Sequence, residues 1–95
     1  RMPIFQSKPI QIQALQIKAR ADLNSVSVFE HASEIEAFGK DFVKVFAADD
    51  LSLTVECITL NGKVMANPTD WLMLKDDEVY PCPDKVFKER YEPVP

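Results

Sequence analysis

Glycine and histidine are scarce in this chain. Two glycines among 95 residues leave no glycine-rich loop of the kind that holds a phosphate. The single histidine, His31, has neither cysteine near it in the sequence, and nucleophilic catalysis needs a base within hydrogen-bond reach of the nucleophile. We therefore expect His31 to be a surface or capping residue and the protein not to be an enzyme.

Cysteine is also rare. Cys57 and Cys82 form no close pair, so they do not match the ligand spacing of a zinc site. Cysteine behaves as a small core residue, and we expect buried free thiols, although a disulfide between the two is conceivable. The sequence predicts no metal and no cofactor.

Long apolar runs are missing too. No stretch approaches the roughly 18 apolar residues of a membrane span, and the N-terminus lacks a charged segment followed by an apolar one. These absences predict a cytoplasmic protein with no membrane partner. The length predicts a single domain over residues 1–95, with 92–95 as a tail. Arg1 precedes Met2, and we expect the natural chain to begin at Met2.

Charge is distributed unevenly along the chain, whose net charge is −4. Residues 1–21 carry four cations and no acid, whereas residues 22–84 carry thirteen acids and four cations. An acidic body repels phosphate backbones, so nucleic acid is a disfavoured partner despite the basic first strand. The acidic surface suits a basic protein partner, or it serves only to keep the protein soluble.

Alternating apolar and polar residues predict several short strands. The first covers Pro9 to Ile17, and others cover Phe42–Phe46, Leu51–Leu60 and 63–66. Between the last two, Asn61-Gly62 is typical of a two-residue type I′ hairpin turn. Residues 71–74 and 79–82 predict a second hairpin.

One long helix is predicted from Ser27 to Phe38. Two Ser-x-x-Glu capping boxes, beginning at Ser27 and at Ser33, leave its start ambiguous. Gly39 is the expected stop, and Pro83-Asp84 begins a short C-terminal helix. Together the elements predict an antiparallel α+β fold, with a strongly curled sheet or small partly open barrel of about five to six strands.

A set of short segments, mostly in the C-terminal half, forms a recognisable pattern: Lys8-Pro9-Ile10, Thr59-Leu60-Asn61-Gly62, Ala66-Asn67-Pro68, Asp70-Trp71-Leu72, Tyr80-Pro81-Cys82-Pro83-Asp84, Phe87 and Tyr91-Glu92. These segments resemble motifs of short proteins of unknown function from tailed bacteriophages and prophages. That group is typified by Gly-Asp-Trp-Ile, Gly-Glu-Phe-Tyr-Pro-Cys, Pro-Asp-Ile-Phe and Thr-Tyr-Glu.

The chain departs from the group in a few places. Thr69 stands where the group has glycine, Asp77-Glu78 replaces Gly-Glu, and the region from Asp22 to Ala32 is longer. The resemblance implies a phage origin and a shared fold, so the cytoplasm expected above would be that of the host. It implies no established activity and no catalytic residue.

Two sets of residues are candidate binding sites. For a host protein, the expected contacts are five acids at predicted turns, which would mimic phosphates or steer a basic partner: Asp49, Asp50, Asp76, Asp77 and Glu78. Solvated turns are the simpler interpretation of these acids. For a small ligand or nucleotide, Trp71 or Tyr80 would form the aromatic wall of a barrel mouth.

The leading functional prediction is a noncatalytic phage accessory protein that binds, and inhibits, a host enzyme or defence complex. A small-ligand-binding module and a phage structural or assembly component are the alternatives. A homodimer also stays open, because exposed strand edges often pair.

Overall fold

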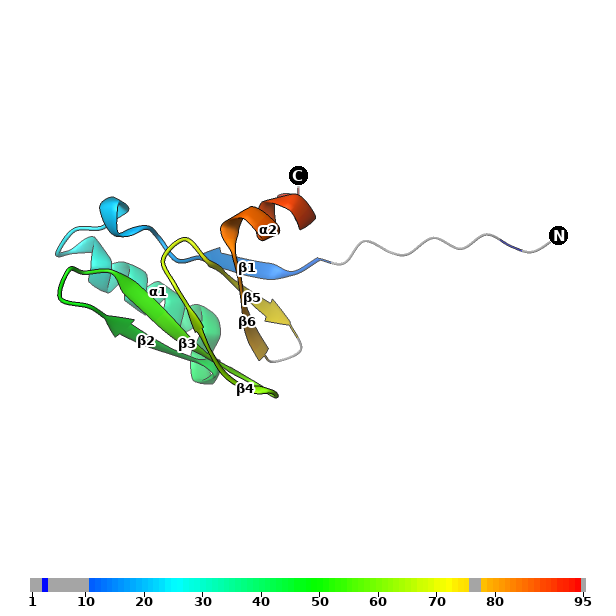
Figure 1. The fold of residues 1–95 in the computed structure, drawn as a ribbon, viewed down its shortest axis with the longest axis horizontal. Coiled ribbons are helices and arrows are strands. Elements are labelled where there is room, and N and C mark those ends of the chain that lie inside the picture. The colour runs from blue at the N-terminus through cyan, green and yellow to red at the C-terminus, as the bar shows by residue number, and fades with distance from the viewer. Residues whose placement is uncertain (1–2, 4–10, 76–77, 95) are drawn as a thin grey trace.

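Six strands and two helices make up the fold in a computed structural model, which describes residues 3, 11–75 and 78–94 (Figure 1). The elements in chain order are β1 Gln13–Gln16, α1 Ser27–Gly39, β2 Val43–Ala47, β3 Leu53–Thr59, β4 Gly62–Ala66, β5 Trp71–Lys75, β6 Glu78–Cys82 and α2 Asp84–Arg90. Short 3₁₀ turns at Arg20–Asp22 and Lys40–Phe42 flank α1. The order of strands and helices agrees with the sequence prediction.

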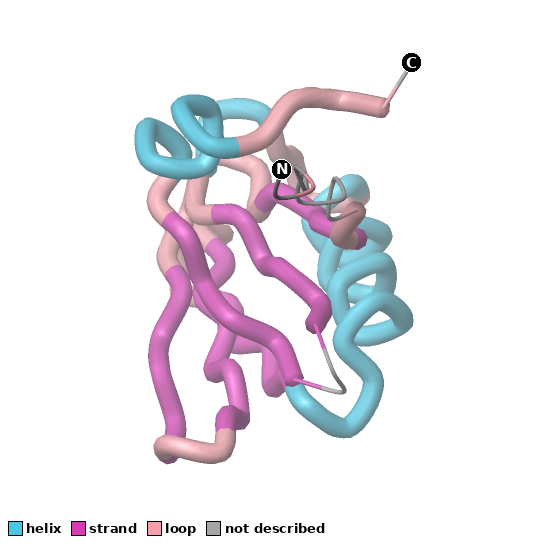
Figure 2. Tube along the Cα trace, turned by 90° about the vertical axis from the view of Figure 1, so that its right-hand side faces the viewer, coloured by secondary structure: helices cyan, strands magenta, loops and turns pink. Residues whose placement is uncertain are grey.

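The strands form two antiparallel three-stranded sheets, in the orders β1-β5-β6 and β2-β3-β4. Helix α1 lies along one side of the strands, and α2 sits at one end of the molecule (Figures 1 and 2). Strand β6 contacts β3 and joins the two sheets. The α+β antiparallel class is confirmed, whereas the sheets described do not close into a barrel, so the predicted curling is not confirmed.

The core fills the space between the two sheets and α1. Side chains at alternate positions of the strands in both sheets point into this core, and α1 adds one apolar stripe. The largest fully buried side chains are Ile17, Val28, Ile35, Leu53, Val55, Cys57, Leu72 and Val79. Both cysteines are free and buried, as predicted.

The start of α1 differs in detail from both predicted capping boxes. Asn24 Oδ1 accepts hydrogen bonds from the backbone N–H groups of Val26 and Ser27, at 2.9 and 2.8 Å. Ser27 Oγ in turn accepts the N–H of Asn24 at 2.9 Å. The helix begins at Ser27, but a side chain three residues earlier satisfies its first donors.

Gly39 ends α1, though not by adopting the left-handed conformation. Lys40 instead has a positive φ, 51°, with ψ −124°, and its N–H donates to the carbonyl of Glu36. Gly39 has φ −90°, and a Cβ there would lie 2.9 Å from Cβ of Val43 and closer to both of its methyl groups. Any larger residue at position 39 would clash with the side chain of Val43, because β2 follows α1 closely.

The hairpin at Asn61-Gly62 is confirmed, but its predicted type I′ turn is wrong. Thr59 pairs with Gly62, so Leu60 and Asn61 form the turn, and only Gly62 has a positive φ, 112°. The Thr59 hydroxyl accepts the N–H of Asn61 and donates to the carbonyl of Gly62. This local bonding favours a turn without left-handed central residues, followed by a glycine that supplies the twist.

His31 is buried, with 3% of its surface exposed, and the surface position predicted for it is wrong. Its Nε2 accepts the backbone N–H of Lys18 at 3.0 Å, and its Nδ1 lies 2.9 Å from Oε1 of Glu34. Because Nε2 is the acceptor, the ring is the tautomer that carries its proton on Nδ1. The side chain thus ties α1 to the segment that follows β1.

Candidate functional site

A groove of about 520 Å³ lies between β1, β5, α2 and the chain that follows α2. Alternation places Ala14 and Gln16 on the same face of their sheet as Trp71 and Met73, opposite the core. Helix α2 crosses one end of this outer face (Figure 1). The groove is lined by Gln11, Ile12, Ala14, Trp71, Phe87, Lys88, Tyr91, Glu92, Pro93 and Val94.

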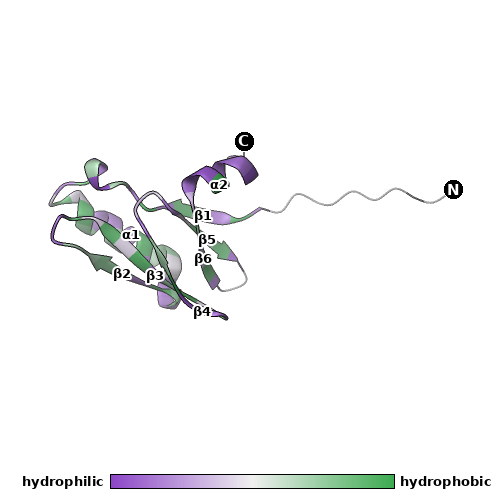
Figure 3. Ribbon diagram, in the orientation of Figure 1, coloured by the Kyte–Doolittle hydropathy of each residue, from purple (hydrophilic) through white to green (hydrophobic). Residues whose placement is uncertain are grey.

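Three stacked rings form one wall of the groove. The ring of Phe87 lies on the indole of Trp71, with centroids 4.1 Å apart and planes at 7°, and Tyr91 packs on its other side at 5.0 Å. Helix α2 is mostly hydrophilic, so these aromatic contacts are what attach it to the sheet (Figure 3). Trp71 therefore packs where the last helix docks on the last hairpin.

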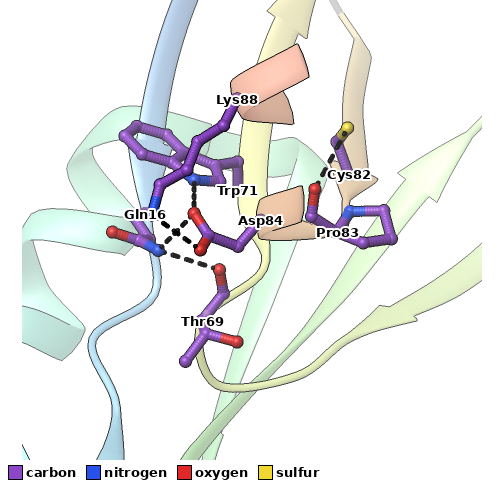
Figure 4. Close-up of polar contacts among 7 residues, drawn as sticks. All are labelled: Gln16, Thr69, Trp71, Cys82, Pro83, Asp84 and Lys88. Atoms are coloured by element: carbon purple, nitrogen blue, oxygen red, sulfur yellow. Dashed lines mark hydrogen bonds and ion pairs between the residues drawn. The ribbon is translucent and has the colours of Figure 1, made fainter. Parts of the chain in front are cut away.

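Asp84, the first residue of α2, fixes the position of the indole (Figure 4). Its Oδ1 accepts hydrogen bonds from Nε1 of Trp71 at 2.8 Å and from Nε2 of Gln16 at 3.1 Å. Its Oδ2 pairs with Nζ of Lys88 at 3.0 Å. One carboxylate therefore joins β1, β5 and α2 beside Trp71.

This network predicts an acid-sensitive attachment of α2. The Trp71 indole N–H, followed by Lys88, holds the pKa of Asp84 below its ordinary value. A carboxyl whose pKa is lowered by folding stabilises the folded state above its unfolded pKa of about 3.9 and loses that contribution as the pH falls further. Fluorescence of Trp71, the only tryptophan, should therefore change on titration below about pH 4.

Asp84→Asn is the matched control for this titration. The amide oxygen still accepts from the indole, but it cannot titrate or form the ion pair with Lys88. The fluorescence of Asp84→Asn should consequently be flat where the wild type changes. An unchanged acid transition in Asp84→Asn would contradict the role given to this carboxylate.

The turn before β5 is strained. Thr69 has φ 76°, a conformation that is costly for a β-branched residue. Hydrogen bonds hold it there, because its N–H donates to the carbonyl of Ile17 at 2.8 Å and its own carbonyl accepts from Nε2 of Gln16 at 3.0 Å. The strain thus lies beside the Asp84 network.

Thr69→Gly should stabilise the protein. Glycine adopts this φ without penalty, although it also gains freedom in the unfolded chain, so we expect a net gain of about 0.5–1 kcal/mol in the free energy of unfolding. Urea unfolding followed by Trp71 fluorescence measures it. Thr69→Ala is the control, because it keeps a Cβ at positive φ and should gain little.

Tyr80 does not take part in this groove. It pairs with Met73 within the β5–β6 hairpin, is half-buried and does not line the groove. The structure therefore brings Trp71 together with Phe87 and Tyr91 rather than with Tyr80. The sequence signal for Phe87 and Tyr91 was their spacing of four residues on one face of a short helix.

The predicted acidic site is divided between separate parts of the molecule. Asp49 and Asp50 are exposed in the turn before β3, and Oδ1 of Asp50 accepts hydrogen bonds from both N and Oγ of Ser52, at 3.0 and 2.6 Å. The hydrogen bonds from Ser52 are the largest cause of the lowered pKa of Asp50. Asp50 is therefore a turn-forming residue as well as an exposed charge.

Glu78, the first residue of β6, is only 8% exposed. It lies beside the end of β3 that is opposite the turn of Asp49 and Asp50. Its Oε1 accepts the N–H of Leu60 at 2.9 Å, which ties β6 to the β3–β4 turn. The seven residues of β3 separate the two ends by about 20 Å. Glu78 is consequently an internal acceptor and not an exposed acid beside Asp49, while Asp76 and Asp77 lie outside the described residues.

The remaining chemistry in the described chain is sparse. Residues 11–75 and 78–94 contain no group of three or more His, Cys, Asp or Glu side chains arranged to hold a metal. Burial raises the pKa of the Cys57 thiol to about 11, so it is protonated at neutral pH. None of the helices described is long and apolar enough to span a membrane.

Comparison with known proteins identifies no relative. The chain matches no family model, no curated protein and no solved structure.

Proposed function

We propose that the protein is a noncatalytic binding protein of phage type, and that it holds part of a partner protein in the groove beside Trp71. The observation that carries this proposal is the groove itself, a preformed hollow of about 520 Å³ with a stacked aromatic wall. Aromatic side chains bury much apolar area at a low entropic cost, which is why they dominate binding sites. A host protein is the proposed partner.

Trp71 is held in place within the wall of the groove by two contacts. Trp71 is fixed by Asp84 on its edge and by Phe87 on one face. A ring that is already ordered loses little conformational entropy when a guest packs against it. The tail residues Pro93 and Val94 also line the groove, and Val94 is 67% exposed, so apolar surface there has no cover from the described chain.

Binding at the groove can be tested with peptides selected from a displayed library of random 12-residue sequences. Selected peptides should shift the fluorescence of Trp71 and bind wild-type protein. Ala14→Leu, which adds bulk to the lining of the groove, should weaken the binding of these peptides at least about tenfold, equivalent to about 1.4 kcal/mol. Ala47→Leu makes the same change at an exposed position of β2 and should leave binding unchanged.

Two results would count against this function. One is a selection that yields no peptide dependent on the groove. The other is equal binding by Ala14→Leu and wild type, which would move the site elsewhere.

A small ligand is the second candidate, because the volume of the groove falls within the range of small-molecule sites. Titration of Trp71 fluorescence with nucleotides separates the two candidates. Saturable quenching by a nucleotide that is lost in Ala14→Leu would favour the small ligand.

Contact through the acidic turn is the competing route to a protein partner. Asp49 is the residue that tests it, because Asp50 also holds the turn through Ser52. Asp49→Lys should weaken a complex that depends on this charge and should leave a complex in the groove unaffected.

A further inference from the structure

The outer edge of β1 has open backbone groups next to the groove. Ile17 bonds to the β5 side, because its N–H donates to the carbonyl of Asp70 at 2.9 Å and its carbonyl accepts from Thr69. In an antiparallel pair, successive residues alternate between facing the partner strand and facing away. The N–H and C=O groups of Ala14 and Gln16 therefore point away from β5, and β1 has no second neighbour among the described strands.

Helix α1 closes this edge at one end only. By the same alternation the N–H of Lys18 also points outward, and there Nε2 of His31 accepts it at 3.0 Å. The next outward groups along the edge are those of Gln16 and Ala14, and no backbone hydrogen bond is found for them in the described chain outside the strand pairing. The described chain thus provides an acceptor for one outward amide of this segment and shows none for those of Gln16 and Ala14.

The open edge and the groove meet at a single residue. Ala14 contributes its side chain to the lining of the groove, while its backbone faces the edge. A strand added to this edge would lie about 4.8 Å from β1. Alternate side chains of that strand would then point to the face that carries Trp71 and α2, where the groove is.

The charges at the groove indicate the chemistry of its occupant. Lys88 is the single cation of the lining and already pairs with Asp84, and Glu92 is the single acid. The other lining side chains are aromatic, aliphatic or the neutral amide of Gln11. Such a lining complements uncharged apolar side chains and has no free cation for a phosphate.

We propose that an extended segment of the partner protein adds to the free edge of β1 as a new strand, and inserts apolar side chains at alternate positions into the groove. This proposal rests on the proposed function and specifies how the partner is held. Backbone hydrogen bonds to Ala14 and Gln16 supply affinity without regard to sequence, and the aromatic groove selects the side chains.

Amide hydrogen exchange of the ¹⁵N-labelled full chain tests the proposal, with a peptide selected as described above as the probe. In the free protein the amides of Ala14 and Gln16 should exchange rapidly. Saturation with peptide should slow both at least about tenfold. Amides of the exposed edge strand β2 are the internal control and should keep their rates.

A second arm uses the same peptide methylated on single backbone nitrogens. Methylation at the alternate positions that face β1 should abolish binding, whereas methylation at the intervening positions should leave it within about threefold. Side chains are identical in the two series, so a difference between them reports backbone pairing.

Several results overturn strand addition. A peptide that shifts Trp71 fluorescence without slowing Ala14 and Gln16 occupies the groove by side chains alone, which leaves the proposed function intact. Amides that are already protected in free monomer would mean that the edge is closed. Protection that depends on protein concentration without peptide would identify a second copy as the occupant, and protection by an oligothymidylate would identify nucleic acid.

Discussion

Trp71→Ala is expected to lower the free energy of unfolding by about 3 kcal/mol, at the low end of the range for removing a large aromatic side chain because Trp71 is only half-buried. The loss has two parts. Phe87 loses the ring on which it stacks at 4.1 Å, and Asp84 loses the indole donor at 2.8 Å. Since these contacts attach α2, the helix should also detach from the sheet before the rest unfolds.

Urea unfolding followed by far-ultraviolet circular dichroism measures this effect without relying on tryptophan fluorescence. Trp71→Phe is the matched control, because it keeps a ring against Phe87 but lacks the donor to Asp84. Its loss should be roughly half that of Trp71→Ala, with the hydrogen bond to a charged group accounting for about 1.5 kcal/mol. A Trp71→Ala variant within about 1 kcal/mol of wild type would refute the anchoring role.

His31→Ala is expected to cost about 2–3 kcal/mol, from the lost packing of a buried ring and from a backbone donor left without its acceptor. The donor is the N–H of Lys18, which Nε2 of His31 accepts at 3.0 Å. The contact joins α1 to the segment after β1, so its loss should also raise amide exchange at Lys18.

His31→Gln separates the hydrogen bond from the packing. Oε1 of glutamine can reach the position of Nε2 and accept from Lys18, so this variant should lose less than about 1 kcal/mol. Chemical denaturation of the two variants at neutral pH gives the comparison. Equal losses in the alanine and glutamine variants would mean that packing, and not the acceptor, makes His31 necessary.

Local patterns were sufficient for most elements of the fold. The alternation in residues 42–46 and 51–60 located β2 and β3 to within two residues, and the helical stripe around Ile35 located α1. These predictions succeeded because burial of one face imposes a period of two on a strand and 3.6 on a helix. The period depends on neighbours in the chain and not on distant contacts.

Local patterns were insufficient wherever two arrangements satisfied the same residues. The two Ser-x-x-Glu boxes fitted the start of α1 equally well, yet Asn24 supplies the side-chain acceptor for its first N–H groups. Asn61-Gly62 fitted a type I′ turn, yet the hydroxyl of Thr59 favours another turn of the same length. Such alternatives differ by about 1 kcal/mol, which a single side-chain hydrogen bond reverses.

The groove depended on pairing between distant segments. Residues 13–16 pair with 71–74, but the pattern of residues 13–16 does not predict this partner. Alternation specifies which face of a strand is buried and not which strand lies beside it. The same pairing brings Gln16 to Asp84, 68 positions away. The packing of α1 brings His31 to the backbone of Lys18. A scarce histidine and a helix-starting aspartate therefore acquired their contacts only in the folded chain.

The amino-acid sequence by itself determined the order of the elements and the antiparallel α+β class, since these follow from apolar periodicity and turn chemistry along the chain. It also determined the burial of both cysteines, because cysteine behaves as a small core residue. Only the tertiary structure decided that Trp71 faces a groove, that Glu78 is an internal acceptor distant from Asp49, and that β1 is an edge strand among the strands described. The physical reason is that each of these depends on which strands pair. That choice is made by the summed packing of the whole core.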